Sequence, residues 1–211
     1  MLLDFATLPA TSRYKLLTAT VLPRPIAWVT TLGEEGQVNA APFSFFNVFS
    51  EEPALIILGL QHHPDGSPKD TTRNIHARGE FVVNIVSEEL LPAMIGTAAA
   101  YPPGKSETAA LGLAVEPGAR IATPRIAAAP VALECRRHTT IAFGDHREIL
   151  IGEVLALHAR EGLIDPVTHR VEWDDDYPVG RLFADRYSRT RESDRHSIPP
   201  APQEPGFSSH S

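Results

Sequence analysis

The sequence has a single cysteine, Cys135, among its 211 residues. An intramolecular disulfide is therefore excluded, and a protein without disulfides suits a reducing compartment. No apolar run approaches the roughly 18 residues that a membrane-spanning helix needs. The first residues also lack the basic start and apolar stretch of a secretory leader. We therefore expect a cytoplasmic protein that makes no membrane contact.

Positive charge is scarce as well, because 19 lysines and arginines stand against 26 aspartates and glutamates, for a net charge of −7. Such a balance disfavours binding to a phosphate backbone, so nucleic acid is not an expected partner. The apolar share of 43% and the charged share of 21% are typical of a globular protein. We expect one domain at residues 1–189 and a Pro- and Ser-rich tail at 190–211, either disordered or arm-like.

Extended segments outnumber helical ones in the pattern of apolar residues. Strands are predicted at residues 26–31, 37–44, 54–60, 81–86, 131–141 and 148–158. Short turns such as 33–36 and 144–145 join neighbouring strands, as in hairpins. Pro42 removes one backbone donor from its strand, which indicates a sheet edge, a bulge or a strand end.

Helices are predicted at the N-terminus around residues 12–17, at 71–78 and at 88–100. The second of these has Asp70 as its expected N-cap and Gly79 as its stop. No βαβ alternation occurs along the chain, so the sheet is expected to be antiparallel. The sequence thus predicts a mostly β fold with appended helices, in the form of an antiparallel barrel.

Three sequence blocks carry a family resemblance: Arg24–Thr31, Asn39–Asn47 and Asp65–Ile75. In this order they resemble the flavin reductase-like family, which has the FMN-binding split-barrel fold and includes flavoredoxin-like proteins and reductases associated with flavoprotein oxygenases. The resemblance extends by motif order from about Leu22 to Tyr187. It implies a homodimeric split barrel, and a small barrel alone offers too little wall to surround a flavin.

The resemblance also implies an FMN site, in which FMN is exchangeable with FAD or riboflavin. An isoalloxazine needs apolar walls and amides in the plane of the ring, and its phosphate needs hydroxyls, a cation and a helix N-terminus. We expect the Asn39–Asn47 block and the lysine-led helix start to form one cradle. Taken singly, each aromatic residue fits a core position equally well, and the helix start fits an ordinary capped helix. The candidate cofactor-binding residues are Trp28, Thr30, Asn39, Ala41, Pro42, Phe43, Ser44, Phe45, Asn47, Lys69, Asp70 and Thr71.

Three further residues are candidates for substrate binding. By resemblance, His146 lies at the mouth of the flavin site, although a turn histidine is usually solvated. Arg181 and Tyr187 resemble the closing strand of the family and would line the neighbouring subunit's site, or else only close the barrel and the dimer.

Metal and thiol chemistry are not expected. Adjacent residues of a strand point to opposite faces, so His62 and His63 cannot ligate one ion together from a strand. Cys135 has no base beside it and is interpreted as a small buried apolar side chain.

The resulting hypothesis is a NAD(P)H-dependent flavin oxidoreductase, with either NADH or NADPH as reductant. The flavin itself carries the redox chemistry, so no protein acid or base is required. Its reduced flavin or electrons would pass to a separate monooxygenase or another acceptor. An FMN-binding electron carrier without efficient NAD(P)H oxidation is the alternative, and a barrel that binds haem or another planar ligand is a third.

Overall fold

The computed structural model describes residues 1–194 and 196–199, and strands dominate it. The strands are β1 (Arg24–Pro25), β2 (Ala27–Leu32), β3 (Val38–Phe43), β4 (Phe46–Glu51), β5 (Ala54–Gln61), β6 (Glu80–Asn84), β7 (Val115–Glu116), β8 (Arg125–Ile126), β9 (Val131–Phe143), β10 (Arg147–Ala159), β11 (Val179–Arg181) and β12 (Tyr187–Arg189). The helices are α1 (Ala10–Thr20), α2 (Asp70–Arg78), α3 (Leu91–Thr97) and α4 (Glu107–Ala110).

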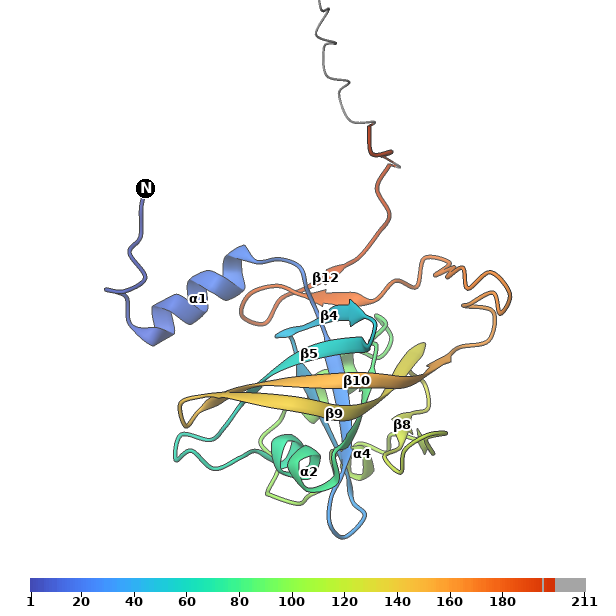
Figure 1. Cartoon of the computed structure of the whole chain (residues 1–211), viewed down its shortest axis with the longest axis horizontal. Helices are drawn as coiled ribbons and strands as arrows, with labels where there is room; N and C mark the ends of the chain where they lie inside the picture. Colours follow the sequence, from blue (N-terminus) through green and yellow to red (C-terminus); the bar gives the residue numbers. More distant parts are fainter. Residues whose placement is uncertain (195, 200–211) are drawn as a thin grey trace, which may run out of the picture.

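Seven strands form the main sheet in the order β3-β2-β6-β9-β10-β5-β4, and every pairing in it is antiparallel. Its two outermost strands, β3 and β4, follow one another in the chain with only Ser44 and Phe45 between them. The sheet must therefore curl until its edges meet, which makes it a barrel split between β3 and β4 (Figure 1). The predicted split barrel with appended helices is confirmed.

A separate small sheet closes one end of the barrel. Its strand order is β1-β11-β12, and Arg24 pairs with Arg181 across it. The segment expected as the closing strand of the barrel, 178–187, is thus part of this second sheet, because the edges of the main sheet already belong to β3 and β4. A third sheet consists of the short pair β7 and β8, in which Val115 lies opposite Ile126.

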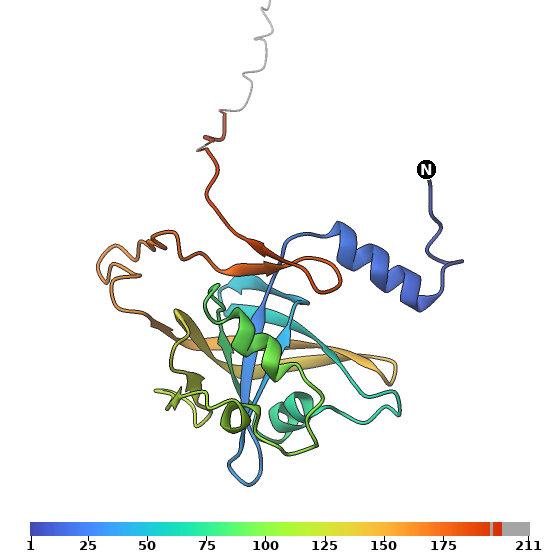
Figure 2. The ribbon, with the colours of Figure 1, turned by 180° about the vertical axis from the view of Figure 1, so that it is seen from behind.

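The helices follow the sequence prediction with changed boundaries. α2 ends at Arg78, and the expected stop, Gly79, follows it as the C-cap with a left-handed φ of 72°. The N-cap is Lys69 rather than the expected Asp70, which is instead the first helical residue. α1 has only Thr18 buried and extends away from the barrel in both views (Figures 1 and 2). α3 spans Leu91–Thr97, shorter than predicted.

Two apolar clusters fill the interior. The first lies inside the curled sheet and includes Leu58, Phe81 and Leu150, all without exposed surface. The second lies between β2, α3 and β8 and includes Trp28 and Met94. Among the described residues, no helix is long and apolar enough to span a membrane. The tail boundary predicted at 190 stays a prediction, and residues 195 and 200–211 lie outside the described residues.

Candidate functional site

The end of β3 forms one wall of a cleft of about 290 Å³. Three of the candidate cofactor-binding residues, Pro42, Phe43 and Ser44, lie in this wall. α1, β1, the end of α3 and the β11–β12 turn supply the others, so the cleft lies where the small sheet meets the open end of the barrel. Its full lining is Tyr14, Thr18, Arg24, Ile26, Pro42, Phe43, Ser44, Ala98, Arg181, Ala184 and Tyr187.

Arg24 is the most buried charge in the cleft, with 8% of its surface exposed. Its guanidinium donates hydrogen bonds to the backbone oxygens of Thr18, Val21 and Leu182, the last at 2.7 Å. Its Nε lies 3.4 Å from Ser44 Oγ. These contacts tie α1 and the β11–β12 turn to the end of β3 and leave the arginine with neutral partners.

Arg181 and Tyr187 line the same cleft from the small sheet. The Arg181 guanidinium lies 4.5 Å from the centre of the Tyr187 ring and donates to the Tyr187 hydroxyl and the Ala184 carbonyl. Both residues were expected at the neighbouring subunit's site. Within one protomer, the structure brings them together with Ser44, and their place at a neighbouring subunit's site stays a prediction.

A second polar group of candidates lies at the start of α2. The Asn39 side-chain amide and the Thr71 hydroxyl are hydrogen-bonded at 3.0 Å, so the β3 block and the α2 block do meet here. Lys69 is exposed beside them. Asp70 does not cap the helix, because its carboxylate accepts from the backbone of Gly104 at 2.7 Å and from Arg73. The α2 start therefore already carries one carboxylate of its own.

Glu107 of α4 adds a second carboxylate next to this group. It is 7% exposed and accepts the Ala40 backbone N–H at 2.9 Å. Burial raises the pKa of Glu107, the bond from Ala40 lowers it, and the charge of Asp70 raises it further. Asp70 at the α2 start is paired with Arg73, and the exposed Lys69 is a cation available to an anion there.

Two candidates are parts of the scaffold. Trp28 is fully buried and its indole N–H donates to Thr97 Oγ1 at 2.9 Å. Thr30 is also fully buried, and its hydroxyl donates to the Pro124 carbonyl at 2.7 Å. β2 is paired on both sides, so these side chains pack inside the protein and do not face the cleft as expected.

The remaining candidate residues of the β3–β4 segment lie at the rim of the cleft or outside the cleft. Ala41 is half-buried on β3, and the Phe45 ring is 40% exposed and lies 6.2 Å from the Tyr14 ring at the α1 wall. Asn47 is exposed on β4, where its side-chain oxygen accepts from Val48. Neither Asn47 nor Lys69 lines this cleft, while the hydrogen bond between Asn39 and Thr71 joins the two blocks beside it.

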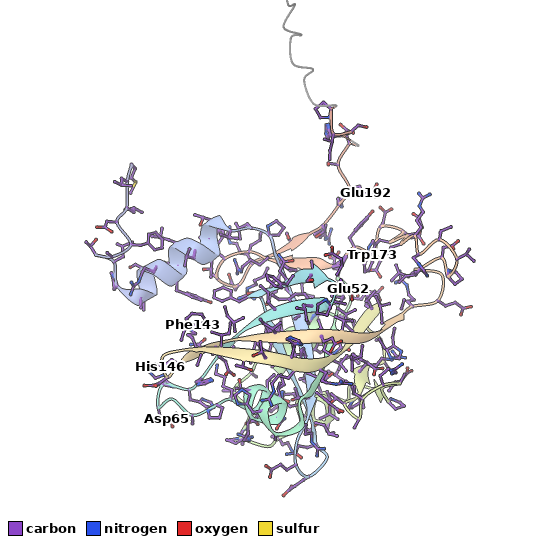
Figure 3. The ribbon with its side chains drawn as sticks, in the orientation of Figure 1. Glu52, Asp65, Phe143, His146, Trp173 and Glu192 are labelled. Atoms are coloured by element: carbon purple, nitrogen blue, oxygen red, sulfur yellow. The ribbon has the colours of Figure 1, made fainter. Side chains whose placement is uncertain are left out.

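His146 lies at the tip of the β9–β10 hairpin, which Figure 3 shows beside Asp65 and Phe143. It is exposed, and its backbone oxygen accepts from His62 at 3.0 Å. It does not line the cleft of its own protomer.

Sequence reasoning missed the α1 and β1 contributions to the cleft. Tyr14 and Thr18 are four residues apart, a spacing that places both on one face of a helix. Arg24 stands in the first motif block, yet nothing in the sequence indicates that its partners are backbone oxygens from both ends of the chain.

The described residues contain no arrangement of side chains suited to thiol or metal chemistry. Cys135 is fully buried, and burial followed by the charge of Glu134 raises the pKa of its thiol, so it is the small buried side chain that the sequence indicated. Within residues 1–194 and 196–199, no group of three or more His, Cys, Asp or Glu side chains is arranged to hold a metal ion.

Comparison with known proteins gives a family match. Residues 19–176 match the family described as "Flavin reductase like domain". An uncharacterized protein of Deinococcus radiodurans is 44% identical over 196 residues, which cover 90% of this chain and 86% of that protein.

Two solved structures match with a TM-score of 0.87 each. One is the 2-nitrobenzoate 2-nitroreductase of Pseudomonas fluorescens, 38% identical, with 94% of this chain and 96% of that chain covered. The other is nitrilotriacetate monooxygenase component B of Bacillus cereus, 32% identical, with 93% of this chain and 98% of that chain covered.

Proposed function

Because this chain belongs to the flavin reductase-like domain family, we propose that it binds FMN and catalyses reduction of the flavin by NADH or NADPH. The observation that carries the proposal is the cleft at the end of β3. Pro42, Phe43 and Ser44 of the Asn39–Asn47 block form one wall of this cleft, and hydrogen-bond donors form the opposite wall. An isoalloxazine combines an apolar body with acceptor atoms along one edge, and this composition matches it.

The cofactor would be held by the residues that the structure leaves accessible. Phe43 and Pro42 provide flat apolar surface, and Ser44 and the β3 backbone provide polar contacts. The exposed Lys69 is the proposed contact for a phosphate, and the buried Thr71, bonded to Asn39 of β3, holds the start of α2 beside it. When bound, the flavin accepts a hydride at its ring from a nicotinamide stacked on it. FAD or riboflavin would exchange with FMN if the protein binds the part of the cofactor beyond the isoalloxazine ring only weakly.

A second protomer completes this site in our proposal. A cleft of about 290 Å³ lies at the lower limit for a ligand site, and one barrel leaves His146 and Asn47 outside it. The outer face of the barrel offers a surface for a partner, since Ile57 lies opposite Ile151 and Ile149 lies opposite Ile141 with their neighbours Leu58 and Leu150 facing inward. We call these four isoleucines the outer apolar strip. Its burial between two copies brings the proposed homodimer together.

The electron acceptor is the second part of the proposal. The similar protein of Bacillus cereus is component B of a monooxygenase, which supports delivery of reduced flavin to a separate monooxygenase. The similar protein of Pseudomonas fluorescens is a nitroreductase, which supports transfer to an organic acceptor. An FMN-binding electron carrier without efficient NAD(P)H oxidation is the competing function.

The absorbance spectrum of the purified protein, recorded before and after FMN addition and dialysis, tests flavin binding. Steady-state oxidation of NADH and of NADPH with added FMN then tests catalysis. Repeated turnover supports the reductase, whereas a single slow reduction of bound FMN supports the carrier. A visible spectrum without flavin bands after FMN addition contradicts both.

A serine pair provides the matched variants. Ser44→Ala removes a hydroxyl that lines the cleft, and we expect its Kd for FMN to rise about fivefold, in line with one lost hydrogen bond of about 1 kcal/mol. Ser50→Ala removes a hydroxyl on β4 whose described contact is the Glu52 backbone, and it should bind FMN like the unmodified protein. Equal FMN affinities for the two variants would remove Ser44 from the proposed site.

A further inference from the structure

Two positive charges face the cleft with no negative charge opposite them. Among the described residues that line it there is no aspartate or glutamate, and neither Arg24 nor Arg181 forms an ion pair with a carboxylate in that part of the chain. The net charge of the whole chain is −7, so acidic groups are plentiful elsewhere. The lack of a counter-ion is therefore a property of this cleft.

The absence of a counter-ion is energetically unfavourable for Arg24, because this residue is buried. With 8% of its surface exposed, its charge is largely removed from water, and its described partners are carbonyl and hydroxyl oxygens that carry only partial charge. Burial lowers the pKa of Arg24, Tyr14 partly offsets this, and the nearby charge of Arg181 lowers the pKa as well. A guanidinium stays charged in proteins, so an anion that entered the cleft would relieve both the desolvation and the mutual repulsion.

Arg181 is held ready for such an anion. Its guanidinium lies over the Tyr187 ring, at 4.5 Å from the centroid, and the Tyr187 hydroxyl and the Ala184 carbonyl take up two of its nitrogens. These contacts fix the plane of the guanidinium, so its remaining N–H groups stay in one plane, which suits a planar anion.

The walls and the size of the cleft restrict the rest of the ligand. Ile26, Pro42 and Phe43 supply apolar surface next to the two arginines. Within one protomer, about 290 Å³ accommodates a single ring with a small substituent, and the flavin of the proposed site would need the further space that a second protomer encloses.

We propose that Arg24 and Arg181 form a binding site for the carboxylate of a small aromatic acid, an organic ligand separate from the flavin. This inference rests on the proposed function in that the ligand would lie beside the flavin-binding Pro42–Ser44 segment, where an acceptor of the electrons is needed. The anion contacts are the guanidinium groups together with the Ser44 hydroxyl.

Calorimetric titration of the full-length protein tests the site, with benzoate as the probe and benzamide as its neutral analogue of the same shape. We expect benzoate to bind at least tenfold more tightly than benzamide, because charge-assisted hydrogen bonds are about twice as strong as neutral ones. Arg181→Gln should weaken benzoate binding about tenfold and leave benzamide binding unchanged.

Arg186→Gln is the matched control. Arg186 belongs to the same β11–β12 turn, stacks on Phe183 at 5.0 Å and does not line the cleft, so its variant should bind benzoate like the unmodified protein. If far-UV circular dichroism shows that Arg181→Gln is unfolded, Arg181→Lys replaces it. Arg181→Lys keeps the positive charge but lacks the planar guanidinium. Its benzoate affinity should fall between that of the unmodified protein and the tenfold weaker affinity expected for Arg181→Gln.

Equal affinities for benzoate and benzamide would overturn the inference. The inference would also be overturned by two results together. Saturating FMN or inorganic phosphate would abolish benzoate binding, and Arg181→Gln would weaken FMN binding by the same factor as benzoate binding. The arginines would then hold the flavin phosphate. The flavin spectrum separates this outcome from failure of the proposed function. Selective benzoate binding without flavin bands refutes only the flavin proposal, and normal flavin bands without benzoate selectivity refute only this inference.

Discussion

Glu134 shows how a single buried carboxylate can hold a loop. It has no exposed surface, and its two oxygens accept the backbone N–H groups of Ala119, Arg120 and Ile121 at 2.6 to 3.1 Å. His158 contacts the same carboxylate. Burial alone would raise the pKa of Glu134, but the bonds from His158 and from the amides outweigh it and lower the pKa below its usual 4.5. The loop that leads to β8 therefore depends on an ionised side chain.

Glu134→Gln should lower the free energy of unfolding at pH 7 by about 2 kcal/mol, because an amide replaces one acceptor oxygen with a donor that faces backbone N–H groups. Urea denaturation measures the loss. Glu161→Gln, at an exposed turn position, should change stability by less than about 0.5 kcal/mol. A depressed pKa gives stability that is present above the unfolded value and is lost as the pH falls through the folded value. The difference in free energy of unfolding between Glu134→Gln and Glu161→Gln should thus be constant from pH 7 to pH 6 and shrink below pH 4.5. A difference that grows on acidification would refute the assigned role.

At this scale the sequence indicates residue types better than partners. The motif blocks pointed to Pro42, Phe43 and Ser44, which do share a cleft. Trp28 was expected to face the cofactor and is instead buried, because β2 is central in the sheet and nothing local reveals strand order. The partners of Arg24 come from backbone oxygens 6 and 158 residues away, which no local pattern encodes.

Among the elements, the connection from β3 to β4 depends on a glycine. Gly59 of β5 donates its N–H to the Phe45 carbonyl at 2.7 Å, which fixes the two-residue link between the barrel edges. A Cβ on Gly59 would lie 2.8 Å from the Phe45 Cβ. The backbone can approach this closely only because residue 59 has no side chain.

We expect Gly59→Ala to destabilise the protein by about 1 to 3 kcal/mol, as overpacking does, and to lower FMN affinity because Phe45 and the neighbouring Ser44 must shift. Thermal unfolding and flavin titration measure the two effects. Gly96→Ala is the comparison, since its Cβ would meet only a flexible methyl group of Leu111 at 3.0 Å inside a helix. A Gly59→Ala protein with the same melting temperature as Gly96→Ala would show that the link is not constrained.

Most elements could be predicted from the sequence, and the exceptions have identifiable causes. The β9–β10 hairpin and α2 carry long periodic patterns and clear stop signals, so their existence was predicted correctly. β4 was not predicted as a strand, because it is a sheet edge whose pattern is broken by a bulge between Val48 and Ser50. Tertiary pairing with β5 makes it a strand.

The proposed homodimer is a property of the whole molecule. Ile141, at 47% exposure, is the most exposed member of the outer apolar strip. Ile141→Glu should shift the protein from twice the chain mass to the chain mass in light scattering and lower its FMN affinity together with dimerisation. Val167→Glu, at a position 85% exposed in a loop, should remain dimeric. A monomeric unmodified protein that binds one FMN per chain would refute the dimer proposal.

The free edge of β3 restricts how copies of this chain can associate. The Val38 carbonyl accepts from the hydroxyls of Ser106 and Thr108, the Ala40 N–H is taken by Glu107, and Pro42 has no N–H to offer. Three backbone positions of this border are thus unavailable to an incoming strand. Growth of the sheet into a continuous ribbon or fibril is consequently disfavoured at β3, which agrees with the proposed closed pair that meets face to face.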